Sequence, residues 1–104
     1  MDINTVVVTG RLVRDAELKV VSDTLSIIKF QIASNRRFKN RAGDLEERTV
    51  FVDCEYLRGS EALLGKMTKG TKATVQATLS QDNWTTEDGT KRSKLYLTVD
   101  NLDL

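Results

Sequence analysis

Apolar and polar residues alternate with a period of two along most of this chain, which is typical of half-buried β-strands. The alternation predicts five strands, with residues 17–21 continuing the first strand after a bend. The strands span residues 3–13, 26–34, 49–58, 71–81 and 92–102. Gly10 lies on the inward face of the first strand, where a missing side chain permits the bulge or bend that corners of small barrels require. Asp88-Gly89 marks a hairpin turn between the last two strands.

One short helix is expected between the third and fourth strands. Ser60 can cap its first turn, and the apolar residues from Leu63 to Met67 have helical spacing. Three strands, a helix and two strands is the element order of the OB-fold, which binds oligonucleotides on strands two and three and on nearby loops. We therefore expect an all-β protein, a five-stranded Greek-key barrel with one short helix between strands 3 and 4. Other small barrels also have five strands, so the element order alone does not exclude them.

Three aromatic residues occupy positions that do not fit a packed core. Phe38 lies among arginines in the polar segment 35–48, which predicts a long hairpin loop. Trp84 lies in a polar hairpin, and Phe51 shares its strand face with acidic residues. An exposed ring set among cations indicates a flat, negatively charged partner, and single-stranded nucleic acid satisfies both conditions. The alternatives are a loop folded back on the barrel for Phe38, a subunit contact or partial burial beneath the long loop for Phe51, and a barrel cap for Trp84.

Composition and charge narrow the class of protein further. The chain has 104 residues, enough for one small domain, and a net charge of +1. Residues 36–41 nevertheless hold four positive charges and no acid, so they form a local basic patch. No apolar run approaches the length of a membrane span, so no membrane partner is expected. The single cysteine, Cys54, excludes an internal disulfide and suits a reducing, cytoplasmic compartment.

The residues needed for most catalytic sites are missing. The chain has no histidine and one cysteine, which excludes a tetrahedral zinc cluster, and its six glycines are too scattered for a phosphate-binding loop. We expect that the protein is not an enzyme and that it binds no cofactor, no metal and no small-molecule substrate. A metal-dependent OB-fold nuclease remains an alternative that incubating labelled oligonucleotide with magnesium or calcium would test.

Several motifs resemble those of bacterial single-stranded DNA-binding proteins. The opening segment Asn4–Leu18 contains a hydrophobic strand, a Gly-Arg-Leu step and Asp-x-Glu-Leu, in the manner of that family. The other motifs are Phe30-x-Ile32-Ala33-x-Asn35-Arg36, Phe51-Val52-Asp53-Cys54, Lys69-Gly70 and Trp84-Thr85-x-x-Asp88-Gly89. They fall in the family's order over nearly the whole chain.

The resemblance implies an OB-fold that assembles as a homotetramer, with a dimer as the alternative. It implies sequence-independent binding of single-stranded DNA in replication, recombination and repair, in the cytoplasm and on the nucleoid. The family's four stacking positions correspond to Phe38, Phe51, Leu57 and Trp84. Leu57 departs from the family because it can pack on a base but cannot stack as a ring does.

Basic side chains beside these positions are expected to contact phosphates. The candidates are Arg36, Arg37, Lys39, Arg41, Arg11, Arg58 and Lys94. The alternative for the charge run is a solvated loop. At Glu55, Ser80 and Asp82 the family often carries aliphatic or basic residues, and this difference supports a second hypothesis, an OB-fold protein-interaction module with weak nucleic-acid affinity.

The family usually carries a long flexible tail with an acidic tip that recruits partner enzymes. This chain stops at Leu104, where the barrel is expected to end. We therefore expect one domain over residues 1–104, without the acidic tail.

Overall fold

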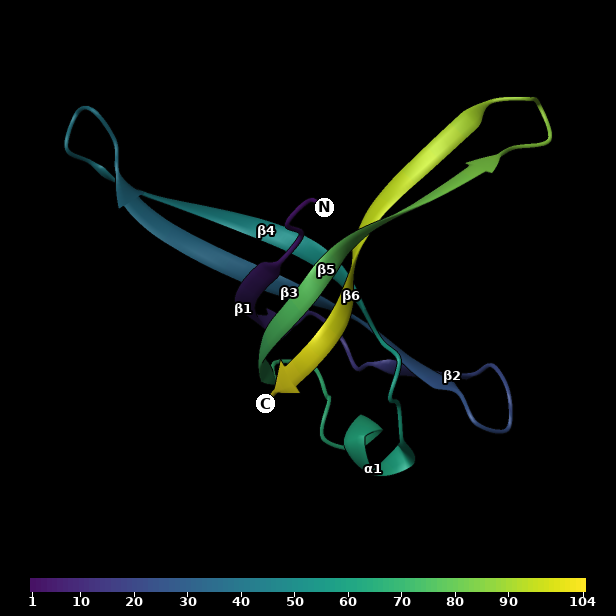
Figure 1. The fold of residues 1–104 in the computed structure, drawn as a ribbon. Helices are drawn as coiled ribbons and strands as arrows, with labels where there is room; N and C mark the ends of the chain where they lie inside the picture. Colours follow the sequence, from purple (N-terminus) through teal and green to yellow (C-terminus); the bar gives the residue numbers. More distant parts are fainter.

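The computed structural model describes all residues from 1 to 104 and contains six strands and one short helix (Figure 1). The elements are β1 (Val6–Leu12), β2 (Glu17–Val20), β3 (Ser26–Lys39), β4 (Leu45–Tyr56), α1 (Glu61–Leu64), β5 (Lys72–Thr85) and β6 (Lys91–Asp103). The sheet order is β1-β5-β6-β4-β3-β2, and β1 also pairs with β3. That last pairing closes five strands into a barrel and leaves β2 outside the ring. The predicted barrel with one helix is confirmed.

The barrel closes where β1 passes from β5 to β3. The end of β1 pairs with β3 at Arg11–Ala33, while β2 pairs with an earlier part of β3 at Glu17–Lys29. Both segments therefore follow the same edge of β3, and β2 continues β1 after a bend, as predicted. A Cβ at Gly10 would lie 2.6 Å from the carbonyl oxygen of Ala33. A side chain there would push the two strands apart, so the close approach requires glycine.

The alternating apolar residues meet inside the barrel. The buried apolar residues are Leu12, Ile28, Phe30, Ile32, Cys54, Met67, Ala73, Val75, Ala77, Leu97 and Val99. Ser60 caps α1 by accepting a hydrogen bond from the Leu63 amide at 3.1 Å. The helix ends at Leu64, so it is shorter than the predicted helical segment, whose apolar residues run to Met67. Met67 lies in the turn that follows and is completely buried, so it still contributes to the core.

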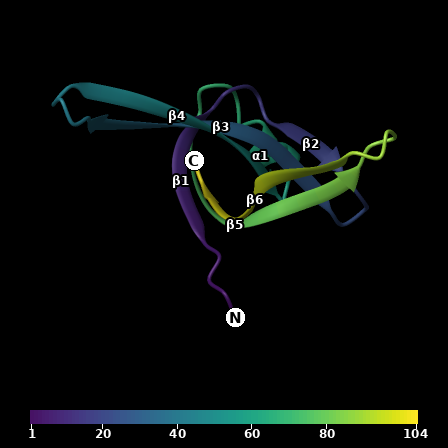
Figure 2. The ribbon, with the colours of Figure 1, turned by 90° about the horizontal axis from the view of Figure 1, so that it is seen from above.

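Two β-hairpins continue well beyond the barrel and diverge from it on opposite sides (Figures 1 and 2). We call them the β3–β4 arm (residues 34–50) and the β5–β6 arm (residues 79–96). The prediction of a loop over residues 35–48 was wrong, because β3 and β4 stay paired up to Lys39–Leu45. Only the turn around Gly43, which has a positive φ of 82°, interrupts them. Polar side chains do not prevent backbone pairing when both faces of a ribbon are in solvent.

The arms explain two further features of the molecule. The radius of gyration is 16.2 Å, whereas about 13 Å is expected for a compact domain of this length. Leu79 and Leu95 belong to the alternating apolar positions of the predicted fourth and fifth strands, but their side chains are 43% and 59% exposed. Both lie on the strand face that points inward within the barrel. At these positions the strands have left the barrel, so no core covers the side chains. No helix of the chain has the length and apolar character needed to cross a membrane.

Candidate nucleic-acid interface

The outward residues of β3, β4 and β6 form one continuous surface, which we call the groove face. Gln31 pairs with Asp53 across β3 and β4, and Glu55 pairs with Thr98 across β4 and β6. Directly paired residues point to the same side of a sheet. Lys94 confirms the connection, because its Nζ lies 3.2 Å from Asp53 Oδ2.

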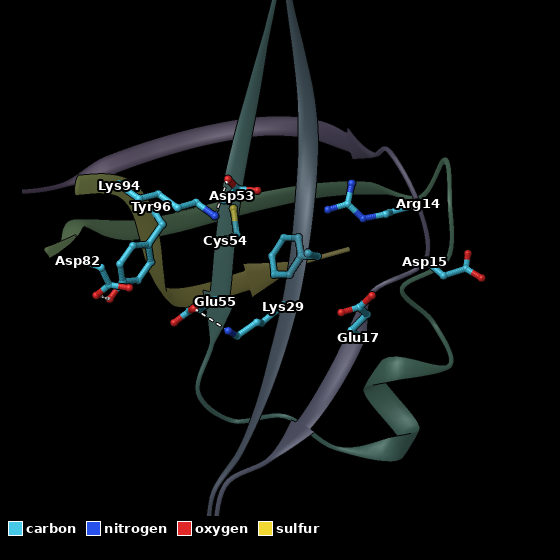
Figure 3. Close-up of a pocket in the computed structure, with 11 residues that line it drawn as sticks. Arg14, Asp15, Glu17, Lys29, Asp53, Cys54, Glu55, Asp82, Lys94 and Tyr96 are labelled. Carbon is cyan, nitrogen blue, oxygen red and sulfur yellow. Dashed lines mark hydrogen bonds and ion pairs between the residues drawn. The ribbon is translucent and has the colours of Figure 1, made fainter. Parts of the chain in front are cut away.

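The floor of the groove face is a network of opposite charges (Figure 3). The Arg14 guanidinium donates to Gln31 Oε1 at 3.4 Å, and the Gln31 amide donates to Asp53 Oδ1 at 3.2 Å. Lys29 forms a second ion pair with Glu55, with 3.5 Å between Nζ and Oε1. Five carboxylates and three cations line the floor. The floor is therefore acidic, and its two lysines already have partners.

Tyr96 lies on the same floor and faces two acids. Its hydroxyl donates a hydrogen bond to Asp82 Oδ1 at 3.4 Å. Desolvation, together with the negative charges of Asp82 and Glu55, raises the pKa of the Tyr96 hydroxyl above its usual value. The phenol therefore stays protonated and can act as a hydrogen-bond donor. No group of three or more His, Cys, Asp or Glu side chains is arranged to hold a metal ion.

Phe51 lies at one end of the groove face and is 63% exposed. Its cross-strand partner is Ala33, which in turn pairs with Arg11 of β1. The methyl group of Ala33 is too small to cover a phenyl ring, so the ring remains open to solvent. Arg11 belongs to the same row of paired residues, and its guanidinium donates to the Gly70 carbonyl at 3.1 Å. This row brings a predicted ring and a predicted cation together.

Trp84 lies on the β5–β6 arm and is 46% exposed. It was expected in the polar hairpin between the last two strands, and the strands extend further into that hairpin than predicted, so that Trp84 lies in β5, paired with Arg92. The neighbouring pair, Asp82 and Lys94, lies two residues away and belongs to the groove face. Trp84 therefore shares that face with Phe51. Lys91 and Arg92 line a hollow beside the indole.

Phe38 does not share the groove face. It pairs with Glu46 on the β3–β4 arm, five positions beyond the pair formed by Ala33 and Phe51. Since faces alternate with every position and the register is unbroken, an odd spacing puts Phe38 and Phe51 on opposite faces. The half-buried Phe38 ring lies within cation–π distance of two guanidinium groups. The Cζ atoms of Arg36 and Arg48 are 5.7 Å and 5.4 Å from the ring centroid.

The remaining predicted site residues are distributed over several places. Arg37 forms an exposed ion pair with Glu47 at 3.7 Å, and Lys39 and Arg41 are exposed near the tip of the β3–β4 arm. Leu57 and Arg58 are exposed just after the end of β4. The structure thus groups most of the predicted cations on or beside the two arms.

Two cations near the candidate rings were missed in the sequence. Arg48 lies opposite Arg36, and Lys72 lies opposite Arg11. Arg48 could have been found by continuing the strands through the polar segment. Ala42 is at the centre of that segment, and residues equally far from it, such as Arg36 and Arg48, face each other. Lys72 gave no comparable signal, because it pairs with Arg11 across β1 and β5, two strands that are far apart in the sequence.

Comparisons with known proteins agree with this geometry. The family model described as "Single-strand binding protein family" matches residues 3–104. The chain is 34% identical over 104 residues to the single-stranded DNA-binding protein of Borreliella burgdorferi, covering 99% of this chain and 70% of that protein. It is 37% identical over 103 residues to the protein of the same name from Treponema pallidum, covering 99% of this chain and 58% of that protein.

Solved structures show the same fold. A structure titled "Plasmodium falciparum SSB complex with ssDNA" superposes with a TM-score of 0.83 at 20% identity, covering 99% of this chain and 93% of the other. A deletion mutant of the single-stranded DNA binding protein from Thermus aquaticus gives 0.81 at 22% identity, covering 97% and 49%. The barrel therefore has the OB-fold of these proteins. With the family match over nearly its whole length, the chain belongs to the single-strand binding protein family.

Proposed function

We propose that this chain binds single-stranded DNA without sequence preference, by stacking bases on exposed rings and by contacting phosphates with basic side chains. The observation that carries the proposal is the pair Phe51 and Trp84, which are 63% and 46% exposed on one face of the barrel. Every base has a flat face, so stacking tolerates any sequence and contributes about 1–3 kcal/mol per base. The names of the relatives and their coverage of this chain support the same function.

The distribution of charge suggests where the phosphates lie. The floor between the two rings carries more carboxylates than cations, so it repels a phosphate backbone. Cations lie near both rings instead. Arg11 and Lys72 continue the row of paired residues that begins with Phe51 and Ala33, and Lys91 and Arg92 line a hollow beside Trp84. The strand is therefore proposed to lay bases across the floor while its phosphates follow these basic borders. Binding, rather than catalysis, accounts for this arrangement.

The binding unit is proposed to be a homo-oligomer, a homotetramer or else a dimer. Only 12 of the 104 residues are buried in the single chain, and apolar side chains such as Val7, Val50 and Leu95 are exposed. Self-association would remove such surface from water. We place this oligomer in the cytoplasm, on single strands exposed during replication, recombination and repair.

The single tryptophan provides the test. Titrating the protein with oligo(dT) should quench Trp84 fluorescence, because the base stacks on the indole. The logarithm of the binding constant should fall linearly with the logarithm of the salt concentration, with a slope of about −0.7 for each phosphate contacted. Light scattering on the same sample gives the oligomeric state. No quenching and no gel shift at low salt would rule out the proposal.

A second candidate function is a protein-interaction module with weak nucleic-acid affinity. The acidic floor favours it, since five carboxylates and three cations suit a basic protein segment better than DNA. The same titration separates the two functions when it is repeated with Trp84→Ala and Phe51→Ala. Unchanged DNA affinity in both variants would favour the protein partner.

A further inference from the structure

Asp82 lies two residues before Trp84 on β5, so both side chains point to the groove face. Its cross-strand partner is Lys94, which would neutralise the carboxylate if the two side chains met. Lys94 instead extends to Asp53, with 3.2 Å between Nζ and Oδ2, and Asp82 forms no ion pair (Figure 3). The Asp82 carboxylate accepts only a long hydrogen bond, from the Tyr96 hydroxyl at 3.4 Å. Most of its capacity to accept hydrogen bonds is therefore unused, beside an exposed ring.

Asp82 and Tyr96 together present a defined pattern of hydrogen-bonding groups. The carboxylate has two oxygens that only accept hydrogen bonds, and the phenol has one O–H that can donate. The bond between them is longer than the about 2.7–2.8 Å typical of O–H···O bonds, so the hydroxyl can turn to a better acceptor. Desolvation and the neighbouring carboxylates raise the pKa of Tyr96, so this donor keeps its proton.

Guanine is the base whose Watson–Crick edge complements this pattern. Its N1–H and amino group are adjacent donors that one carboxylate can accept in parallel, and its O6 can accept from a hydroxyl. Cytosine and adenine each present one amino group beside a ring nitrogen, so they offer the carboxylate a single donor. Thymine presents its N3–H between two carbonyl oxygens, which a carboxylate repels. A negative charge that disfavours phosphates thus discriminates among bases.

We propose that Asp82 and Tyr96 read the base that stacks on Trp84, favouring guanine over cytosine and adenine, and these over thymine. Residues two apart on a strand are separated by about 7 Å, so a base that stacks on the indole can extend its edge to the carboxylate. The inference rests on the proposed function and deepens it. Stacking still accepts every base, and the acid adds a graded preference that excludes no sequence.

A single guanine in oligo(dT) provides the test, because one guanine per strand avoids the structures that guanine-rich strands form. Anisotropy titrations would use the shortest labelled oligo(dT) that binds, within the ~4–16 nucleotides that one OB-fold covers. The same oligomer would carry one central guanine or hypoxanthine. Hypoxanthine keeps the purine ring, N1–H and O6 but lacks the amino group. Guanine should raise the affinity about fivefold, and hypoxanthine by less than about twofold.

Substitutions separate the contributions of the two side chains. Asp82→Asn should abolish the guanine advantage, because an amide has one acceptor oxygen, and should strengthen binding to plain oligo(dT), because a negative charge is lost. Tyr96→Phe keeps the ring but loses the contact with O6, so it should lower the advantage about twofold. Glu87→Gln removes an exposed carboxylate from the turn of the same arm. It is the control for charge and should keep the full advantage.

Three results would overturn this preference while leaving the proposed function intact. Equal affinity for the oligomers with and without guanine would show that Asp82 does not read the base. Equal gains from guanine and hypoxanthine would assign the gain to purine stacking. An unchanged guanine advantage in Asp82→Asn would place the contact elsewhere. If none of the oligomers quenched Trp84 fluorescence, the proposed function itself would fail.

Discussion

The barrel and the two arms are built from the same strands but are stabilised differently. Within the barrel, β3 contributes Ile28, Phe30 and Ile32 to a closed core. Further along the same strand, Phe38 lies between charged neighbours on a ribbon that is in solvent on both faces. The barrel supplies the free energy of folding, whereas the arms present side chains that the core does not need. Sequence changes in the arms can therefore alter binding with little effect on stability.

The charges show the same division. On the floor of the groove face, both lysines are held by carboxylates, Lys94 of the β5–β6 arm by Asp53 and Lys29 of the barrel by Glu55. On the β3–β4 arm, only Arg37 is engaged in an ion pair. A cation that already has a carboxylate partner releases fewer counterions when DNA binds, so the β3–β4 arm is expected to contribute more to the salt dependence of binding than the floor.

The largest expected effect is on stability, and it should distinguish the barrel from the arm. Ile32→Ala removes a fully buried side chain and should lower the free energy of unfolding by about 2–5 kcal/mol. Val50→Ala, at an exposed position on the arm, should change it by less than about 0.5 kcal/mol. Urea denaturation at a fixed protein concentration measures both. Similar losses in the two variants would show that the arm has a packed core of its own in the assembled protein.

The next effect should appear in binding and not in stability. Phe51→Ala and Trp84→Ala should each weaken single-stranded DNA binding by about 1–3 kcal/mol, because each removes a stacking surface. Their unfolding free energies should stay within about 0.5 kcal/mol of the native value, since both rings are exposed. Anisotropy titrations with labelled oligo(dT) measure the binding. Val20→Ala, an exposed apolar change on β2, is the matched control, and an equal loss in that variant would remove the special role of the rings.

The barrel was predictable from the sequence because its residues alternate between apolar and polar. Ala73, Val75 and Ala77 point inward and the register follows from that pattern. The outer parts of the arms were not predicted as strands, because the polar segments 35–48 and 82–91 carry no alternation of apolar and polar residues. The pairing there is set by the strands that lead out of the barrel and by the turn at Gly43.

The candidate site could be predicted only in part, again because the arms carry no alternation of apolar and polar residues. Rings in polar surroundings can be seen without a structure, so the sequence predicts Phe38, Phe51 and Trp84 as candidates. It does not predict that Phe38 and Phe51 lie on opposite faces, since the segment containing Phe38 carries no alternation from which a face follows. The ion pair between Asp53 and Lys94 joins residues far apart in the sequence. It depends on the parallel pairing of β4 with β6, two strands that are not consecutive in the chain, so the sequence pattern does not predict it.

Freeing Lys94 from its ion pair on the floor should raise DNA affinity, an effect that is smaller than the loss of a ring and opposite in sign. Asp53→Asn removes the partner of Lys94 and leaves the neutral amide in its place. The pair is partly exposed, with 55% and 36% of the two side chains accessible, so breaking it should have little effect on stability. Lys94 could then contact a phosphate, and DNA affinity at low salt should rise severalfold, with a slope steeper by about 0.7.

The control for this variant is Asp23→Asn, which removes the same charge from the exposed turn between β2 and β3. It should raise affinity less, because it frees no paired lysine. An unchanged salt slope in Asp53→Asn would show that phosphates do not approach the floor even when Lys94 is free.

The smallest expected effect is local and lies at the tip of the β5–β6 arm. The Asp88 carboxylate accepts hydrogen bonds from the Thr86 hydroxyl and from the Thr90 amide, the latter at 3.0 Å. These bonds lower the pKa of Asp88 from 3.8 to about 2. A lowered pKa means that the carboxylate stabilises the turn fully above pH 3.8, and that this contribution is lost as the pH falls through about 2.

Because the arm packs against no core, the loss should stay within the turn. Hydrogen exchange at the Thr90 amide should be slow at pH 5 and should lose its protection only near pH 2, while amides of β1 and β5 inside the barrel remain protected. In Asp88→Asn, the protection of the Thr90 amide from exchange should not change near pH 2. Loss of barrel protection together with that of the turn would mean that the arm and the barrel unfold as one unit, and that the distinction between them does not extend to their stability.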